Sequence, residues 1–233
     1  MDVVGLLDWE QVRAQLDHEG YAVLPRLLNE QEIGSLLGLL GSAGSDFGVE
    51  RVPGGVGQGE RFFFSRSLPA AIAHLLGSLY EHLMPFANRW NEKLQISERY
   101  PSTLRAFVLE NRAAGGSPPR STLSRLREGD YQPLHRCYDG RHGFPLQLEA
   151  LLSEPGQEFC GGEFVMTEQR PRMQSRPLVV PLRKGDVAVI SAGLRPNQGA
   201  KGNYRVNLRH AISRVHSGER IGLELVFHDG GSA

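Results

Sequence analysis

The segment LHRCYDG, residues 134–140, carries three side chains at alternate positions that can bind a metal. His135, Cys137 and Asp139 would point to the same side of an extended strand, because successive side chains of a strand alternate between its two faces. Imidazole, thiolate and carboxylate are all established metal ligands. If this segment is a strand, its spacing predicts a metal-binding face.

A further candidate ligand, His210, lies in the segment YRVNLRHAIS. In a strand it would share a face with Val206, Leu208 and Ile212, so the imidazole would point toward the protein interior. Two histidines and one carboxylate on a jelly roll form the facial triad of non-heme Fe(II) oxygenases, which leaves coordination positions open. The sequence thus predicts a metal site that is built on both histidines.

Arg220 begins the next segment, RIGLELVF. In a strand, alternate residues from Ile221 to Phe227 would form an apolar face suited to packing on helices. Arg220, Gly222 and Glu224 would form the opposite face, which indicates a polar cavity if helices cover the first face. An arginine in such a cavity can hold a carboxylate through two parallel hydrogen bonds. Arg220 is therefore a candidate ligand for a dicarboxylate co-substrate.

The first ~95 residues favour helices that would support these strands. Asp8 can cap a first helix, and Asn29 with Glu32 matches a capping box at the start of a second. A third helix is predicted over residues 69–94, with a break near Pro85. The glycine-rich segment GGVGQGE lacks the spacing of phosphate-binding motifs, so we expect a flexible loop there.

From residue 121 onward, short apolar runs alternate with glycine-bearing turns, which is typical of an antiparallel β-sandwich or barrel. We therefore predict a mainly β fold with N-terminal helices, in which a double-stranded β-helix (a cupin-like jelly-roll barrel) is backed by helices. The expected organisation is a single domain over residues 1–233. Residues 1–120 would be mostly helical support, and residues 121–229 would form the β core.

Composition narrows the class of protein. The sequence has 26 basic and 26 acidic residues and a formal net charge of +0, so we predict no nucleic-acid partner. The start MDVVGLLDWEQV lacks the basic residues of a signal peptide, and no stretch has the length of a membrane span, so we expect no membrane association. The two cysteines, Cys137 and Cys160, cannot form a disulfide framework, which favours a cytoplasmic location with free thiols. Cys160, which precedes a turn, is expected to pack inside the protein.

The chain resembles the bacterial Fe(II)/2-oxoglutarate-dependent oxygenases of the prolyl-4-hydroxylase-like superfamily. GYAVLPRLLNEQEI resembles the N-terminal opening of that family. Further family blocks, over nearly the whole chain, are matched by FANRWNE, REGDY, FPLQLEALLSEPG, GGEFVMTEQRPRMQSR, VVPLRKGD and GNYRVNLRHAISRVHSGER. The resemblance implies Fe(II) and 2-oxoglutarate as cofactors. It also implies His210 as the distal metal histidine and Arg220 as the arginine that binds the C5 carboxylate of 2-oxoglutarate.

The chain departs from the family pattern at three positions. His135-Arg136-Cys137 stands where the family has His-Gln-Asp, so the carboxylate of the triad is missing from its place. Gly222 replaces a threonine or serine that touches the co-substrate, and Leu126 replaces a tyrosine found in many relatives. Cys137 is then either a thiolate ligand or a small residue left after the loss of a metal site. Asp139 is either a turn residue or an alternative ligand.

These observations lead to two functional hypotheses. The first is a non-heme oxidoreductase that acts with O2 on a small-molecule substrate, with His135, Cys137 and His210 as metal ligands. Fe(II) is the expected metal, Cu and Zn are alternatives, and 2-oxoglutarate is the expected co-substrate, bound by Arg220. The second is a pseudoenzyme that binds a small molecule on the same fold without redox chemistry. The sequence does not specify the substrate or the oligomeric state.

Overall fold

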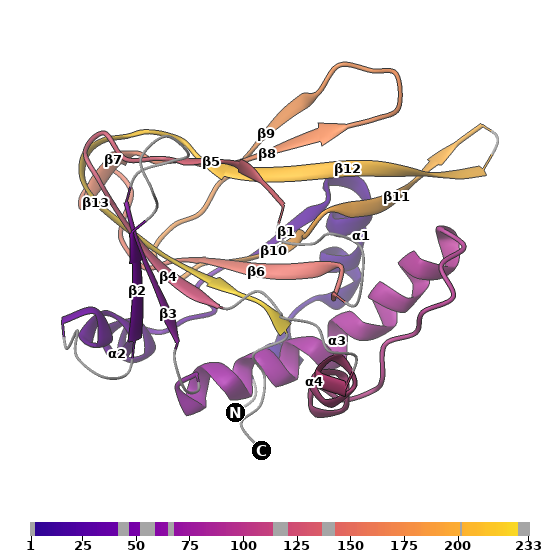
Figure 1. Ribbon diagram of the computed structural model, residues 1–233, viewed down its shortest axis with the longest axis horizontal. Helices are drawn as coiled ribbons and strands as arrows, with labels where there is room; N and C mark the ends of the chain where they lie inside the picture. Colours follow the sequence, from indigo (N-terminus) through magenta and orange to yellow (C-terminus); the bar gives the residue numbers. More distant parts are fainter. Residues whose placement is uncertain are drawn as a thin grey trace.

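The computed structural model describes the chain in seven segments. They cover residues 3–41, 47–51, 59–64, 68–113, 121–136, 143–200 and 202–227. Figure 1 shows a layered arrangement in which a smaller β-sheet faces a larger one, and the long helix α3 lies on the outer side of the larger sheet. Among the described residues, no helix has both the length and the apolar character needed to cross a bilayer.

The helices begin and end at signals that are visible in the sequence. They are η1 (Val4–Leu6), α1 (Trp9–Glu19), α2 (Glu30–Gly41), α3 (Ala70–Lys93) and α4 (Leu104–Ala113). The Asp8 side chain accepts a hydrogen bond of 3.0 Å from the backbone of Gln11, and Gly20 ends α1 in the left-handed conformation with φ +81°. The predicted capping box of α2 is confirmed, because Asn29 and Glu32 exchange two hydrogen bonds of 2.9 Å.

The predicted break near Pro85 is wrong. Pro85 lies inside α3, which runs continuously from Ala70 to Lys93. A proline removes one intrahelical hydrogen bond, but this helix buries an apolar stripe along its whole length, and that packing outweighs the local cost. The stripe consists of Ile72, Leu76, Leu79, Leu83, Phe86 and Trp90.

The strands form the two facing sheets of the predicted jelly roll, with all adjacent strands antiparallel. The larger sheet has the order β1-β10-β6-β13-β4-β3-β2, with β7 also paired to β13. Its strands are β1 (Tyr21–Leu24), β2 (Phe47–Arg51), β3 (Glu60–Phe64), β4 (Thr122–Arg127), β6 (Leu146–Leu151), β7 (Phe159–Gly161), β10 (Val187–Ser191) and β13 (Val215–Leu225). The smaller sheet has the order β11-β12-β8-β9, with β5 also paired to β12. Its strands are β5 (Gln132–His135), β8 (Phe164–Gln169), β9 (Arg176–Val180), β11 (Leu194–Gly199) and β12 (Gly202–Ile212).

Two of these strands lie in a part of the chain for which helices and a loop were predicted. β2 and β3 extend the larger sheet beyond β4, so the N-terminal half contributes to the β core as well as supporting it. The glycine-rich segment before Glu60 lies mostly outside the described residues. Within the described strands, the two sheets face each other without closing into a barrel.

Alternating side chains of the larger sheet supply two separate cores. On β10, Val187 and Val189 join the core beneath the helices, whereas Ala188 and Ile190 face the space between the sheets. β13 shows the predicted alternation, because its apolar residues pack toward the helices and its polar residues are turned to the inter-sheet space. The polar side chains of Arg220 and Glu224 are nevertheless buried, at 2% and 8% exposure. The inter-sheet space therefore contains buried charged groups, which need hydrogen-bond or ionic partners from the protein or from a ligand.

Candidate active site

The two candidate metal histidines meet inside the jelly roll. His135 on β5 and His210 on β12 lie directly opposite each other in adjacent antiparallel strands. Their ring centroids are 4.2 Å apart, with an angle of 63° between the ring planes. His210 is buried at 2% exposure and His135 is half-buried, so the pair is open to solvent on the β5 side. The structure thus brings together the two histidines that the sequence placed 75 residues apart (210 − 135).

In both imidazoles the Nε2 atom can accept a hydrogen bond or bind a metal. Burial lowers the pKa of His210 well below its ordinary value, with smaller contributions from His135 and Arg61, so His210 is neutral at neutral pH. The Nδ1 atom of His135 lies 3.0 Å from the carbonyl oxygen of Pro133, to which it donates, so Nε2 is the acceptor nitrogen of this ring. A neutral imidazole whose second nitrogen is held by a carbonyl is the usual form of a metal-binding histidine. The two side chains fit a metal.

Each Nε2 atom also faces a carboxamide. Gln132 Nε2 lies 3.3 Å from His135 Nε2, and Gln147 Nε2 lies 3.4 Å from His210 Nε2. The Oε1 atom of Gln147 is buried without a hydrogen-bond partner among the described residues, so it can accept a hydrogen bond from a ligand. A ligand bound between the histidines would therefore meet these two amides first.

The third ligand of a triad is not found in the part of the chain that the structure describes. Cys137 and Asp139 both lie outside the described residues. Within those residues, no three His, Cys, Asp or Glu side chains come together as a metal site. A facial triad has three protein ligands, so the histidine pair alone would not complete one.

A pair of buried carboxyl groups lies beside the histidines. Glu149 on β6 and Glu224 on β13 are direct cross-strand neighbours, and each is 8% exposed. Burial raises the pKa of Glu149 well above its ordinary value, and the nearby Glu224 raises it further. Arg61 forms an ion pair of 3.2 Å with Glu224. We infer that Glu149 is neutral at neutral pH, since burial and the adjacent carboxyl group both disfavour its ionised form.

Gln147 lies between this carboxyl pair and His210, one of the two candidate metal histidines. Its Nε2 atom donates a hydrogen bond of 2.8 Å to Glu149 and lies 3.4 Å from His210 Nε2. Sequence reasoning placed Glu224 on a polar strand face but missed Gln147, Glu149 and Arg61. A signal was present for two of them, because polar and aliphatic residues alternate in PLQLEALL.

Arg220 is buried in the same inter-sheet space, and most of its hydrogen-bonding capacity is unused. Its Nε atom donates a hydrogen bond of 2.8 Å to the carbonyl oxygen of Gly162. Its two terminal nitrogens have no hydrogen-bond or ion-pair partner among the described residues. Burial lowers the pKa of Arg220 to about 10, a value at which it remains a cation at neutral pH. Such a guanidinium can receive an anionic ligand.

A cavity of about 240 Å³ lies against Arg220. Most of its lining is apolar, and Arg220 and Glu163 are its charged residues. Neither histidine lines the cavity, but Phe164 does, and the same ring stacks on His210 with centroids 5.6 Å apart. Cys160 is exposed and lines this cavity, so the expectation that it packs inside the protein is wrong. The volume is below the roughly 300–1,000 Å³ of a drug-sized ligand site and suits a small acid.

The surroundings of Gly222 give a physical reason for a glycine at this position. A Cβ atom at this position would come within 2.8 Å of the Arg220 Nη1 atom and 3.2 Å of the Ser124 hydroxyl oxygen. A threonine or serine at this position would therefore collide with this guanidinium in its present place. The glycine makes room for the position that Arg220 adopts.

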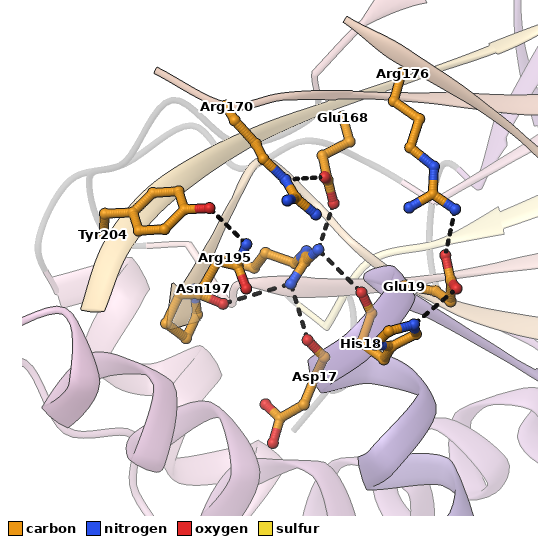
Figure 2. Close-up of polar contacts among 10 residues, drawn as sticks. Asp17, His18, Glu19, Glu168, Arg170, Arg176, Arg195, Asn197 and Tyr204 are labelled. Carbon is orange, nitrogen blue, oxygen red and sulfur yellow. Dashed lines mark hydrogen bonds and ion pairs between the residues drawn. The ribbon is translucent and has the colours of Figure 1, made fainter. Parts of the chain in front are cut away.

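A second buried arginine, Arg195, lies on β11 and contacts Glu168 near the C-terminal end of β8. Its Nη2 atom forms a short ion pair with Glu168, and both side chains are almost completely buried. Arg195 also donates hydrogen bonds of 2.8 Å and 3.0 Å to the backbone carbonyls of Asp17 and His18, at the C-terminal end of α1. Figure 2 shows the guanidinium between these partners, with Arg170 on the other carboxylate oxygen of Glu168. This cluster joins the smaller sheet to α1.

Comparisons with known proteins agree with the fold. Residues 59–230 match the family Oxygenase-NA, described as "Oxygenase, catalysing oxidative methylation of damaged DNA". The uncharacterized protein Rv2227 of Mycobacterium tuberculosis (strain H37Rv) is 37% identical over 168 residues, which cover 71% of each chain. The same identity and coverage hold for the uncharacterized protein MT2286 of Mycobacterium tuberculosis (strain CDC 1551).

Solved structures with this fold include a prolyl-4-hydroxylase from Pseudomonas putida, with a TM-score of 0.57 and 12% identity over 93% of this chain and 96% of that one. An oxidoreductase of the 2OG-Fe(II) oxygenase family from Burkholderia pseudomallei has a TM-score of 0.54 and 19% identity, over 97% and 94% of the two chains. These neighbours are 2OG-Fe(II) oxygenases with a jelly-roll fold, in agreement with the resemblance seen in the sequence.

The family description also corrects one prediction. We excluded a nucleic-acid partner because the net charge is zero, but the matching family is described by its action on damaged DNA. Net charge is a sum over the whole chain and does not report how charges are distributed over the surface. The exclusion is therefore wrong. Since the match covers well over half of the sequence, this chain belongs to the Oxygenase-NA family and is an oxidoreductase.

Proposed function

We propose that this protein hydroxylates a damaged base of a nucleic acid, using a metal held by His135 and His210 and 2-oxoglutarate held by Arg220. The observation that carries the proposal is the contact between the two histidine rings, 4.2 Å apart, in the same inter-sheet space as a buried arginine with unused donors. The family description supports the choice of nucleic acid as the substrate class.

Cys137 is the third metal ligand in this proposal, because it lies two residues beyond His135 in the position of the family's carboxylate. The Fe(II) site would supply the O2-activating redox chemistry typical of facial-triad oxygenases. A thiolate ligand is softer than a carboxylate, so the same set would also bind Cu or Zn. The neutral state of His210 favours metal binding at neutral pH, since no proton must be displaced from it.

Arg220 is the proposed site for the distal carboxylate of 2-oxoglutarate. Its terminal nitrogens can donate two parallel hydrogen bonds to a carboxylate in a site from which water is largely excluded. The neutral state of Glu149 matters here, because a second buried carboxylate would repel a dianionic co-substrate. The cavity of about 240 Å³ beside Arg220 is too small for a nucleotide, so the base would approach from the half-buried His135 side.

The proposed reaction couples hydroxylation of the substrate to the oxidation of 2-oxoglutarate. 2-Oxoglutarate and O2 give succinate and CO2, one oxygen atom enters succinate, and the other converts a substrate C–H bond into C–OH. On an N-alkyl group, the hydroxylated carbon would leave as an aldehyde and restore the N–H of the base. Damaged bases of this kind can be presented by rotation out of the helical stack or in a single strand.

The test is succinate release from Fe(II)-reconstituted protein under air, with an N-methylated single-stranded oligonucleotide and its unmodified counterpart. We expect the methylated strand to stimulate turnover and the His210→Ala variant to lose both bound metal and turnover. Elemental analysis of wild type and Cys137→Ala decides whether the thiolate binds the metal. A wild-type protein that binds neither metal nor 2-oxoglutarate would contradict the proposal.

A further inference from the structure

We propose that the outer face of the smaller sheet, at Arg136, Arg205 and Arg209, binds the sugar–phosphate backbone of the nucleic acid. We call these three residues the arginine face. The inference rests on the proposed function and extends it to the surface that holds the substrate. Figure 1 shows that β5 and β12 lie on the side of the molecule away from α3 and α4.

Charge is unevenly distributed in a chain whose net charge is +0. Glu168 is the only acidic residue in the five described strands of the smaller sheet and in the turn from residue 170 to residue 175. It is buried and already paired with Arg195 and Arg170. The exposed cations of this sheet are therefore not neutralised from within it. Clustered exposed arginine on one face is the electrostatic signature of phosphate binding.

Strand alternation fixes the direction of the two arginines on β12, and a hydrogen bond places Arg136 beside them. On β12, Leu208 and His210 point into the interior, so Arg209 and Arg205 project outward, and both are exposed. Arg136 is also exposed, and its Nη1 atom donates a hydrogen bond of 3.3 Å to the Asn207 side chain, which lies between the two outward arginines. None of the three arginines has an ion-pair partner among the described residues.

The arginine face is coupled to the metal site through the chain itself. Arg136 directly follows His135, and Arg209 directly precedes His210, so each histidine has an outward arginine as its neighbour. β5 pairs with β12 alone among the described strands, which leaves its other edge open next to the half-buried His135. A backbone held on the outer face could pass this edge and present a flipped base to the histidines.

The spacing suits several phosphates. Arg205 and Arg209 are four residues apart, which is about 13 Å along an extended strand. One strand of DNA carries a phosphate about every 3.4 Å along the helix axis, so the two guanidinium groups would contact different phosphates. Leu134, exposed at 48% on the same face as Arg136, offers an apolar contact for a sugar or an unstacked base.

The test measures binding of a fluorescein-labelled single-stranded oligonucleotide by anisotropy over a salt series. The variant carries Arg136→Ala, Arg205→Ala and Arg209→Ala together. The matched control is Arg105→Ala, because Arg105 is an exposed arginine on α4 that also has no ion-pair partner among the described residues. We expect at least tenfold weaker binding for the triple variant at about 0.1 M salt. The slope of log affinity against log salt should fall by about two, from three lost contacts of about 0.7 each.

A triple lysine variant at the same positions should retain most of the binding, since lysine also neutralises phosphate as a point charge. Turnover of a methylated nucleoside, which has no phosphate, should be the same in wild type and triple alanine variant, and this separates loss of the surface from loss of the active site. Equal oligonucleotide affinity and equal salt slope in the triple alanine variant and the control would overturn the inference while leaving the proposed oxygenase activity intact. Absence of oligonucleotide binding by the wild type, or equally tight binding of phosphatidylserine vesicles, would also overturn it.

Discussion

Arg195 and Arg220 are two arginines buried between the same pair of sheets, at 1% and 2% exposure, yet their surroundings differ completely. Arg195 faces the carboxylate of Glu168 and two carbonyl groups at the end of α1. Arg220 donates one hydrogen bond, to Gly162, and its terminal nitrogens have no partner in the described part of the chain. The first residue joins elements of the fold, and the second is the one that we propose to bind a ligand.

The physical basis of this difference is the cost of burying charge. A buried cation is tolerated when a counter-ion and hydrogen bonds replace its lost hydration. Arg195 has both. At Arg220 the burial lowers the pKa to about 10, which means that desolvation of the cation is only partly compensated. A bound anion would complete the compensation at Arg220, in keeping with the role that we propose for it.

The largest expected effect comes from removing Arg195, the arginine that has a counter-ion. Arg195→Met leaves Glu168 buried with only Arg170 beside it and removes the donors to the α1 carbonyls. We expect the free energy of unfolding to fall by about 3–5 kcal/mol, as measured by urea denaturation at pH 7. The double variant Arg195→Met with Glu168→Leu should recover a large part of this loss. A double variant as unstable as the single one would show that the ion pair is not the source.

Arg220→Met should change the free energy of unfolding little and weaken the binding of 2-oxoglutarate. Because its terminal nitrogens have no partner in the described part of the chain, we expect the free energy of unfolding to change by less than about 1.5 kcal/mol. The affinity for 2-oxoglutarate, measured by calorimetry on metal-loaded protein, should fall at least tenfold, since a charge-assisted pair contributes about 1.5–3 kcal/mol. Metal content should not change. Equal 2-oxoglutarate affinity in wild type and variant would remove Arg220 from the binding site.

Gly222→Thr sharpens the comparison by moving Arg220 without deleting it. The new Cβ would lie 2.8 Å from Nη1, and the end of a long side chain can shift at small cost in stability. We expect roughly threefold to tenfold weaker 2-oxoglutarate binding and a stability change within about 1 kcal/mol. Gly34→Ala is the matched control, because a Cβ there meets nothing within 4 Å. Unchanged affinity in Gly222→Thr would mean that the present position of Arg220 is not required.

Glu149, whose carboxyl group is buried in the same inter-sheet space as Arg220, should make the stability depend on pH. The pKa of Glu149 is raised in the folded state, so its contribution to stability is fully present below the unfolded pKa near 4.5 and is lost as the pH rises toward the folded pKa. The group should lower the free energy of unfolding by at most about 1.4 kcal/mol per pH unit in that window. Glu149→Gln should remove this slope in urea denaturation between pH 5 and pH 8. Identical slopes in variant and wild type would indicate an ionised Glu149.

Local patterns in the sequence predicted much of the fold. The capping box at Asn29 and Glu32 and the glycine that ends α1 were visible because caps depend on residues three or four positions apart. The polar and apolar faces of β13 followed from the period of two. The continuity of α3 through Pro85 could not be predicted, because its packing against the larger sheet outweighs a local signal.

By itself the sequence determined that His210 on β12 and Arg220 on β13 face the inter-sheet space, because that assignment needs only strand alternation. Tertiary structure decided the partners across strands: His135 against His210, Glu149 against Glu224, and Arg195 rather than Arg220 with a counter-ion. Cross-strand register joins residues far apart in the chain, so no local pattern encodes it. The distribution of charge over the surface could not be predicted from the sequence for the same reason. Equal numbers of basic and acidic residues gave a neutral sum, and only the folded sheet separates the arginine face from the acids that balance it.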